Sequence, residues 1–528
     1  MHSFDALHTS TAYAICLAIL WLLLTIVLRS FFHPLRSYPG PIFGRITDAY
    51  GGYFALGKRL HLTTYENFQK YGPVVRQAPN RLVFNTVEAL YDIYLNSRVT
   101  KGHSYTKSQL RARYPSIINV IDKDQHRRKR KLIGQPLTER SMRSFEPTME
   151  SEIDVFLNLL LESAQPGHVV DMTERCQRLG VDIVGLLAFG FPLNTQTDEK
   201  FRFILNLMDS MAWRISTYMQ LPALAPLEKV LAWLGVRQVL RFGTAVQTII
   251  QTRMAQEKNA HRDLYSMVAD YIGKGQEGLY KDELWPEAIL FITAGGTTTA
   301  TTMSALFFYL SRNPKCYAKL AAEIRSTFES SNDIRSGPQL SSCKYLRACI
   351  DETLRMSPPS LTTLWRQQDT KDDSGEPFVV DGHVIPHGTQ VGVSLYSIMH
   401  NEEYFPDSFT FKPERWLDDS NASEVDGEGE KEDRATMRKA FTPFLIGDRA
   451  CAGKSMAYME ASLTLARTIW LFDFEVAPGK SGEVGGGKAG RTDGRGHPGE
   501  YQLEDIFVAG HRGPNLVFRA RGGLHKAL

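Results

Sequence analysis

One ten-residue stretch near the C-terminus constrains this chain more than any other. The stretch FLIGDRACAG, residues 444–453, contains a single cysteine, Cys451, among small residues. A disulfide requires a second cysteine and a zinc site usually requires several ligands, and neither lies nearby in the sequence. The following residues, AGKSMAYMEASLTLARTIWLF, have the pattern of a helix. The thiol therefore precedes a helix N-terminus, where free N–H groups and the helix dipole favour a thiolate.

The residues around Cys451 indicate what a thiolate there would bind. Gly447 and Gly453 allow a flat cofactor or a sharp turn to approach the backbone closely. Arg449 can pair with an acidic group on that cofactor. Together these features describe a thiolate ligand to heme iron, with N–H groups that spread its charge. The alternative is a buried structural cysteine in a loop, where most single cysteines belong.

The same stretch carries a resemblance to a known family. The fixed positions of the pattern F-x-x-G-x-R-x-C-x-G are all filled, by Phe444, Gly447, Arg449, Cys451 and Gly453. The stretch resembles the heme-binding loop of the cytochrome P-450 family, and the resemblance extends from about residue 38 to the C-terminus. It implies a mainly α fold with a small β-rich lobe, and heme b whose iron is bound by Cys451.

A second motif, ETLR, places Glu352 and Arg355 on one helix face, where an ion pair forms easily. Alone, such a pair predicts only a solvated surface bridge. Pro358 and Pro359 end this helix, and FKPERW follows downstream with Arg415. By resemblance to the family, the glutamate and the two arginines form a buried polar triad behind the heme. Its expected role is structural and not catalytic.

A third motif is FITAGGTTTATT, residues 291–302, inside a long apolar helix. Its adjacent glycines and its run of threonines contradict helix propensity, because each glycine costs about 1 kcal/mol relative to alanine. Small residues let a heme and a diatomic ligand lie against the helix, and threonine hydroxyls can bond back to carbonyls. The alternative is a packing seam between crossing helices.

This third segment resembles the family's oxygen-activation helix, written A-G-x-(acid)-T-T. In that register Ala294, Gly295 and Gly296 match the groove against the cofactor, and Thr298 matches the relay threonine. Thr297 stands where an aspartate or glutamate is common. A carboxylate there would supply protons, whereas a neutral hydroxyl can only pass them on. Both threonines are catalytic candidates, and monooxygenation remains the leading prediction because Thr298 is present.

A basic run, DQHRRKRKL at residues 124–132, would by default be a solvated helix face. The resemblance matches His126 and Arg130 to a family pattern in which the arginine meets a heme propionate. Arg366 is a further propionate candidate. The other cations of the run are predicted to dock an acidic redox partner: Arg127, Arg128, Lys129 and Lys131.

The N-terminus is predicted to be a membrane anchor. Residues 12–28 form a charge-free apolar run at the short end of what spans a bilayer, after a tail at residues 1–11. A cleavable signal peptide is the alternative, but the first ten residues lack Lys and Arg and no small-x-small cleavage site follows. A basic, proline-containing stem at residues 29–45 leads to the catalytic domain, residues 46–528. Its cations predict a cytosolic body, and the resemblance implies a single-pass protein of the endoplasmic reticulum.

Composition bounds the remaining possibilities. The 528 residues are 43% hydrophobic and 23% charged, as expected of a globular protein with a large core. A net charge of +3 argues against nucleic acid as a partner. The six cysteines are scattered, which favours a reducing compartment. Residues 418–433, rich in acids, and residues 478–500, rich in glycine, are predicted surface insertions. Residues 378–393 predict a small sheet, and a hairpin is expected to turn at residues 512–515.

The resemblance implies an oxidoreductase, a heme-thiolate monooxygenase that inserts one oxygen atom from dioxygen into a lipophilic small molecule. The motifs are closest in style to fungal members that act on secondary metabolites. Electrons are expected from NADPH through a separate reductase, because the chain has no dinucleotide fingerprint, with cytochrome b5 as a second candidate donor. Substrate contacts are expected in four segments: residues 114–120, 207–224, 360–364 and 506–509.

Two other functions stay open. The missing acid at Thr297 fits a heme-thiolate isomerase or dehydratase that rearranges an oxygenated substrate without a reductase. Outside enzymes, the chain would be a membrane-bound heme protein that binds a ligand or gas without turnover. A requirement for NADPH separates the first alternative from monooxygenation, and the formation of any product separates the second.

Overall fold

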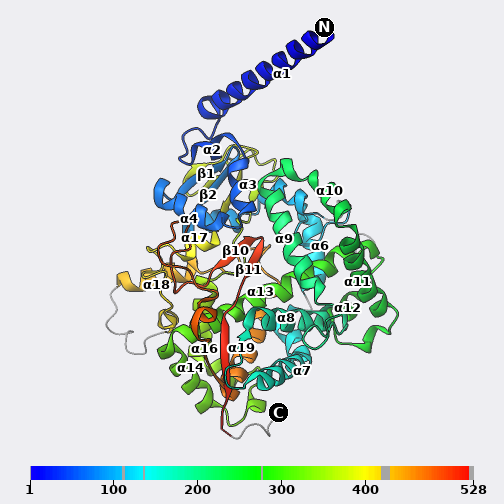
Figure 1. The fold of residues 1–528 in the computed structure, drawn as a ribbon, viewed down its shortest axis with the longest axis vertical. Coiled ribbons are helices and arrows are strands. Elements are labelled where there is room, and N and C mark those ends of the chain that lie inside the picture. Colours follow the sequence, from blue (N-terminus) through cyan, green and yellow to red (C-terminus); the bar gives the residue numbers. More distant parts are fainter. Residues whose placement is uncertain (1, 110–112, 135–136, 275–277, 418–427, 523–528) are drawn as a thin grey trace.

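The structure is a computed structural model that describes residues 2–109, 113–134, 137–274, 278–417 and 428–522 (Figure 1). A helix at the N-terminus, α1 (His2–Val27), projects from the body and continues as a π-helical turn, Leu28–Phe32. The segment Ser10–Phe32 is long and apolar enough to cross a membrane, by length and composition. The helix therefore begins well before the apolar run that predicts it.

The centre of the body is α13 (Leu284–Arg312), which crosses the middle of the molecule in Figure 1. It is buried along most of its length, as expected for a helix that is apolar on nearly every side. Its main partner is α8 (Met172–Phe189), which begins at the N-cap Asp171 and ends at Gly190 in the left-handed conformation. The main apolar core also takes in α7 (Glu139–Ser163), α16 (Lys344–Met356) and α19 (Lys454–Leu471).

The other α-helices surround this core. They are α2 (Ile42–Ile46), α3 (Ala49–Leu56), α4 (Leu60–Tyr71), α5 (Val87–Tyr94), α6 (Lys123–Gly134), α9 (Phe203–Gln220), α10 (Leu227–Leu234), α11 (Val236–Met254), α12 (Leu264–Val268), α14 (Pro314–Thr327), α15 (Pro338–Ser342), α17 (Leu395–Met399) and α18 (Glu428–Ala440). The chain is thus mainly helical, as its sequence predicts.

The β-rich lobe lies at the end of the molecule from which α1 projects (Figure 1). Its five-stranded sheet has the order β1-β2-β8-β5-β3, with only β2 and β8 parallel, and packs on a second apolar cluster. Its strands are β1 (Val74–Ala78), β2 (Arg81–Phe84), β3 (Val99–Lys101), β5 (Arg366–Gln368) and β8 (Gln390–Val393). The smaller sheets contain β4 (Val170–Asp171), β6 (Val379–Val380), β7 (His383–Val384), β9 (Phe472–Val476), β10 (Leu503–Ile506), β11 (Val508–His511) and β12 (Asn515–Ala520).

The predicted hairpin turn at residues 512–515 is wrong. Strand β11 pairs with β10 across Phe507, whose φ of +80° makes the reversal. Strand β12 pairs instead with β9 and β4. Phenylalanine carries no turn signal, whereas Gly513 and Pro514 do. Sequence reasoning therefore placed the reversal several residues too late.

The two predicted insertions differ. Residues 418–427 lie outside the described residues, and the rest of the acidic segment belongs to α18. Residues 478–500 are irregular apart from the 3₁₀ turn Gly479–Glu483, yet they pack on the body. The ring of His497 stacks on Phe409 with centroids 4.2 Å apart, and buried Glu500 accepts a hydrogen bond from Tyr396.

Candidate active site

The cysteine loop connects α18 to α19 and is closed by its own backbone. The Cys451 N–H donates to the Phe444 carbonyl at 2.9 Å, and the Ala450 N–H donates to the Gly447 carbonyl at 3.0 Å. Gly447 has a φ of +77°, and a Cβ there would lie 2.2 Å from the Tyr94 carbonyl oxygen. Only glycine fits this position. Helix α19 begins at Lys454, so Cys451 lies just before a helix N-terminus, as predicted.

The Cys451 thiol faces an internal space. Burial raises its pKa, and a hydrogen bond from the Gly453 N–H with the charges of Arg130 and Lys454 offsets only part of this effect. The residue is nevertheless accessible to solvent. A group that is surrounded by protein and still accessible lines a cavity. A metal ion bound there would keep the sulfur deprotonated.

A cluster of cations lies beside this loop. Arg130 on α6 donates to the Ala450 carbonyl at 2.8 Å, and Arg449 donates to the carbonyls of Val120 and Ile121 at 2.8 and 2.9 Å. Arg366 on β5 donates to the Trp365 carbonyl at 3.1 Å. The structure therefore brings together the arginines that the sequence predicts near the cofactor.

His126 and Lys101 complete this cluster. The pKa of His126 is lowered to about 3, first by burial and then by the charges of Arg449, Lys101, Arg130 and Arg366. Sequence analysis did not identify Lys101, which lies on β3. No motif marks it, and the only sequence signal is a lysine in a short strand that is otherwise apolar or β-branched.

The donor set fits the two carboxylates of a heme. Within the described residues, none of the three arginines and neither Lys101 nor His126 forms an ion pair with a carboxylate of the chain. Burial and the charge of Arg366 together lower the pKa of Arg449 to about 10. Buried like charges need an anion nearby. Two propionates above an accessible thiol would supply that charge.

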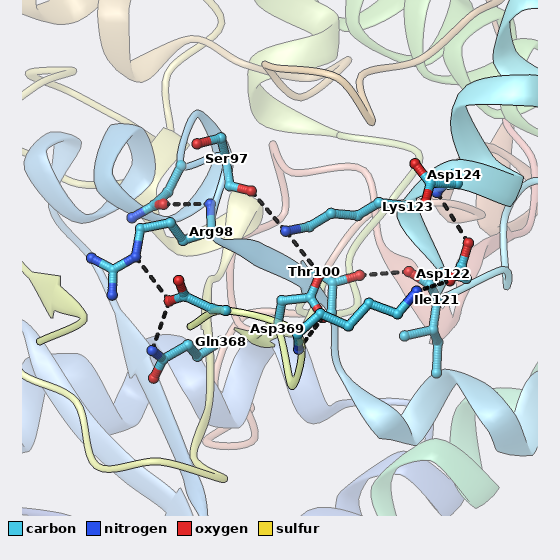
Figure 2. Close-up of polar contacts among 12 residues, drawn as sticks. Ser97, Arg98, Thr100, Ile121, Asp122, Lys123, Asp124, Gln368 and Asp369 are labelled. Carbon is cyan, nitrogen blue, oxygen red and sulfur yellow. Dashed lines mark hydrogen bonds and ion pairs between the residues drawn. The ribbon is translucent and has the colours of Figure 1, made fainter. Parts of the chain in front are cut away.

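Polar contacts hold the sheet edge formed by β3 and β5, which carry Lys101 and Arg366, against the start of α6 (Figure 2). Lys123, at the start of α6, donates to the Ser97 carbonyl at 2.7 Å and pairs with Asp369 at 2.9 Å. Thr100 Oγ1 donates to the Ile121 carbonyl at 2.5 Å. These contacts hold the start of α6 against the paired strands β3 and β5. They thereby fix the positions of Lys101 and Arg366, which are partners in that pairing.

Helix α13 has one small accessible face. Ala294 is exposed although most of the helix around it is buried. Thr298 Oγ1 donates to the Ala294 carbonyl at 2.6 Å and is partly accessible. Thr297 Oγ1 donates to the Thr293 carbonyl at 2.6 Å, but Thr297 is buried. Of the two catalytic candidates, only Thr298 lies beside the accessible face.

The two glycines of α13 have a packing role against α8. A Cβ at Gly295 would lie 2.5 Å from Val184, and one at Gly296 would lie 2.7 Å from Val181. A Cβ at Gly180 would lie 2.4 Å from the Gly296 carbonyl oxygen. Both glycines of α13 therefore serve its close crossing with α8. These glycines therefore agree with the alternative of a packing seam between crossing helices. Ala294 and Thr298, which are accessible, agree with the functional interpretation.

The polar triad forms as predicted. The Glu352 carboxylate accepts two hydrogen bonds of 2.9 Å from Arg355 and one of 3.0 Å from Arg415. The side chains of Glu352 and Arg355 are fully buried, and that of Arg415 is nearly so. Trp416 Nε1 also donates to this carboxylate at 3.0 Å. Burial raises the pKa of Glu352, but Arg355 and Arg415 lower it more, so the net pKa is below the ordinary value. The triad ties α16 to the segment that leads toward the cysteine loop.

The prediction that the whole basic run docks a partner is wrong for Lys129. Its side chain is fully buried, and its ammonium lies 3.0 Å from Glu283 and 2.9 Å from Glu287. Arg128 pairs with Glu283 at 2.7 Å. A helix has one inward face, and a composition-based reading of the run cannot tell which of its cations occupy it.

Three of the four predicted substrate segments meet in the structure. Ser216 on α9 and Thr362 have hydroxyl oxygens 3.4 Å apart, and Ala212 on α9 belongs to one apolar cluster with Ile506 and Val508 of the β10–β11 hairpin. The fourth segment, residues 114–120, is held by Arg449 at Val120. All four segments are therefore tied either to the cation cluster or to one another.

This fold and site define a heme-thiolate protein. A family model described as cytochrome P450 matches residues 34–484. The chain is 34% identical to a cytochrome P-450 monooxygenase, poxM, of Penicillium oxalicum, over 97% of this chain and 96% of the relative. It is 32% identical to the monooxygenase AKT7 of Alternaria alternata, over 94% of each chain. It is 31% identical to the monooxygenase atnE of Emericella nidulans, over 97% of each chain.

The chain belongs to the cytochrome P-450 family, as a monooxygenase. Membership implies heme with a cysteine thiolate as iron ligand, and the site described above provides for both the iron and the propionates. The fold class and the family that the sequence predicts are confirmed.

Proposed function

We propose that the chain is a membrane-anchored monooxygenase that inserts one oxygen atom from dioxygen into a lipophilic small molecule of fungal secondary metabolism. Its electrons come from NADPH through a separate reductase, with cytochrome b5 as a second donor. The observation that carries the proposal is the accessible Cys451 thiol beside a cation cluster that has no carboxylate partner within the described residues. The fungal monooxygenases above support the metabolic setting.

Each residue group has a distinct role in this proposal. Heme bound at Cys451 supplies dioxygen activation, promoted by electron donation from the thiolate. Arg130, Arg366 and Arg449 hold its carboxylates and thereby orient it. The Thr298 hydroxyl holds and passes a proton at Oγ1. Glu352, through its arginines, keeps the cysteine loop in place.

The remaining parts of the proposal concern location and partners. Helix α1 anchors the chain as a single span in the endoplasmic reticulum membrane, and the basic residues after it keep the body in the cytosol. A groove beside the cysteine loop offers the reductase a charged surface near the cofactor. Its lining includes Arg347, Arg438, Lys454 and Tyr458.

The proposal is tested with membranes that contain the chain and a reductase. Lipophilic candidates are incubated with NADPH and ¹⁸O₂, and mass spectrometry follows incorporation of one labelled atom. Cys451→Ala is the control: it should lose both the product and the red-shifted carbon monoxide band of a thiolate-bound heme. A band that persists in Cys451→Ala would contradict the ligand assignment.

One observation favours a second candidate function. Thr297, where an acid is common, is a buried neutral residue, so the helix lacks that proton source. A heme-thiolate isomerase or dehydratase needs none. Product that forms without NADPH and without label would establish this candidate. A normal carbon monoxide band with no product from any candidate would favour a ligand-binding protein without turnover.

A further inference from the structure

Arg81 on β2 is a buried cation that has no role in the site described above. It is 4% exposed, and its guanidinium donates to the Met219 carbonyl at 2.7 Å and to the Gln220 carbonyl at 3.2 Å. It also donates to the Gln220 side-chain oxygen at 3.0 Å. Met219 and Gln220 are the last residues of α9, where helix carbonyls lack partners within the helix and carry its negative end. Arg81 therefore caps the C-terminus of α9.

The same guanidinium lies over Trp365, which directly follows the predicted substrate segment 360–364. The guanidinium carbon is 5.3 Å from the centroid of the Trp365 ring, and Trp365 is fully buried. Strand β2, which carries Arg81, lies between β1 and β8 in the five-stranded sheet. One cation thus holds both the end of α9 and the end of segment 360–364 against the same sheet.

Two predicted substrate contacts pack where Arg81 joins these elements. Met219 and Trp365 belong to one apolar cluster, and partly buried Ile215 and Phe507 pack against it. Ile215 and Phe507 belong to two different predicted substrate segments. The hydroxyl contact between α9 and segment 360–364 lies about one turn before the capped end of the helix. The position of that end therefore affects three walls of the proposed substrate site.

We propose that Arg81 is a positioning residue of the substrate site: by holding the end of α9, it limits how far the helix can withdraw from segment 360–364, and so limits the bulk of the ligand that the site admits. A lysine would serve only in part, because an ammonium lacks the planar fork of donors and does not stack on an aromatic ring. The inference rests on the substrate site that we propose, but not on oxygenation.

The test uses the full-length, heme-loaded protein and two nitrogen ligands of heme iron, imidazole and the much bulkier clotrimazole. The shift of the heme absorption band gives their dissociation constants without NADPH or a reductase, so failure of the oxygenation proposal and failure of this inference are distinguishable. In Arg81→Met, the ratio of the clotrimazole constant to the imidazole constant should fall roughly tenfold, because hydrogen bonds from a charged group no longer hold α9. Amide hydrogen exchange in the last two turns of α9 should be faster.

Arg76→Met is the matched control. Arg76 lies on the neighbouring strand β1 and is also a buried arginine that donates to backbone carbonyls, but these belong to Pro79 and to the stem. In this variant the ratio and the exchange of α9 should stay close to those of the unmodified protein. An unchanged or higher ratio in Arg81→Met, or an equal fall in Arg76→Met, would overturn the proposal.

Arg81→Lys covers the case in which Arg81→Met does not load heme. It keeps the buried charge but loses the fork of donors, so the ratio should fall and the end of α9 should exchange faster than in the unmodified protein. A ratio equal to that of the unmodified protein would then contradict the positioning role.

Discussion

Thr297 and Thr298 are adjacent in the sequence and form the same type of side-chain hydrogen bond, but one is buried and the other is partly accessible. Each hydroxyl donates to the carbonyl four residues earlier at 2.6 Å. Thr297 is 5% exposed and belongs to the packed side of α13, whereas Thr298 lies beside exposed Ala294. Of the two hydroxyls, only that of Thr298 is accessible, so we expect the proton relay to use Thr298.

Thr298→Ala should uncouple NADPH consumption from product formation, because a positioned proton donor is worth roughly 10²–10⁴-fold in rate. More of the NADPH should appear as hydrogen peroxide and less as product. Product, peroxide and NADPH are measured in one reaction, with heme content as the check on folding. Thr297→Ala is the control and should stay coupled. Unchanged coupling in Thr298→Ala with full heme content would remove the relay role and strengthen the rearrangement function.

Residues of the site could be predicted from the sequence when their motif is contiguous. Cys451, Gly447 and Arg449 lie within one short loop, and the structure places them as expected. Lys101 could not be found, because its partners, the carbonyls of Ile117 and Ile118, meet it only in the folded chain. The contact of Gly295 with Val184 on α8 could not be predicted either, because a glycine in a helix pattern does not reveal which element packs against it.

At the scale of elements, the close crossing of α8 and α13 depends on glycines at the contact between the two helices. Gly296→Ala should destabilise the heme-loaded protein by about 1–3 kcal/mol, because the new methyl group overlaps Val181. Gly243→Ala, in α11, meets nothing within 4 Å and should stabilise by about 0.5–1 kcal/mol. Loss of the heme absorption band on heating compares the two. A Gly296→Ala protein as stable as Gly243→Ala would show that the crossing adjusts freely.

The packed segment 478–500 should respond to pH through Glu500. Burial raises the pKa of Glu500, and hydrogen bonds from Tyr396 and Gln502 oppose the rise only in part, so the pKa is about 7. The unfolded chain loses this proton near the ordinary pKa of about 4.3, so the folded chain binds more protons between the two values. Stability from this group is therefore complete at low pH and is lost as the pH rises towards 7.

Glu500→Gln should remove that dependence. Relative to the unmodified protein, the variant should gain stability progressively as the pH rises from about 4.3 towards the folded pKa and hold a constant advantage above it. Urea unfolding at a series of pH values measures the difference, and Gln502→Leu, whose parent residue also contacts Glu500, is a control that keeps the carboxyl group. A difference that does not vary with pH would contradict the role of Glu500.

The elements themselves could be predicted where the pattern is long. The predictions of a long apolar helix, α13, and of a helix after Cys451, α19, are both confirmed. The C-terminal hairpin was misplaced because its reversal at Phe507 depends on tertiary packing against Phe68, Tyr105 and other buried residues, and not on turn chemistry. The Gly-rich segment packs through His497 and Glu500, which composition alone does not reveal.

For the whole molecule, the boundary between anchor and body follows from burial. Leu35 is fully buried in the apolar cluster of the β lobe, and the Arg76 guanidinium reaches its carbonyl at 3.4 Å. Residues 2–28 include most of the segment that is long and apolar enough to cross a membrane, whereas the residues after Phe32 belong to the folded body.

Deleting residues 2–28 should release most of the protein from membranes with its heme spectrum and thermal stability retained. Deleting residues 1–37 should release it as well but lower its stability, because Leu35 is lost. Sedimentation of membranes measures release, and heating measures stability. Protease added outside sealed microsomes should digest the body of the full chain. Protection from the protease would place the body in the lumen and contradict the proposed topology.

The cations gathered beside Cys451 have a consequence beyond the site. Lys101, Arg366 and Arg449 repel one another in a buried setting, and the chain offers them no carboxylate ion pair within the described residues. A ligand that binds only the folded state stabilises that state by mass action. A newly made chain that meets no porphyrin therefore stays exposed to proteolysis for longer. The cellular amount of this enzyme should then follow iron nutrition, even when its messenger RNA is held constant.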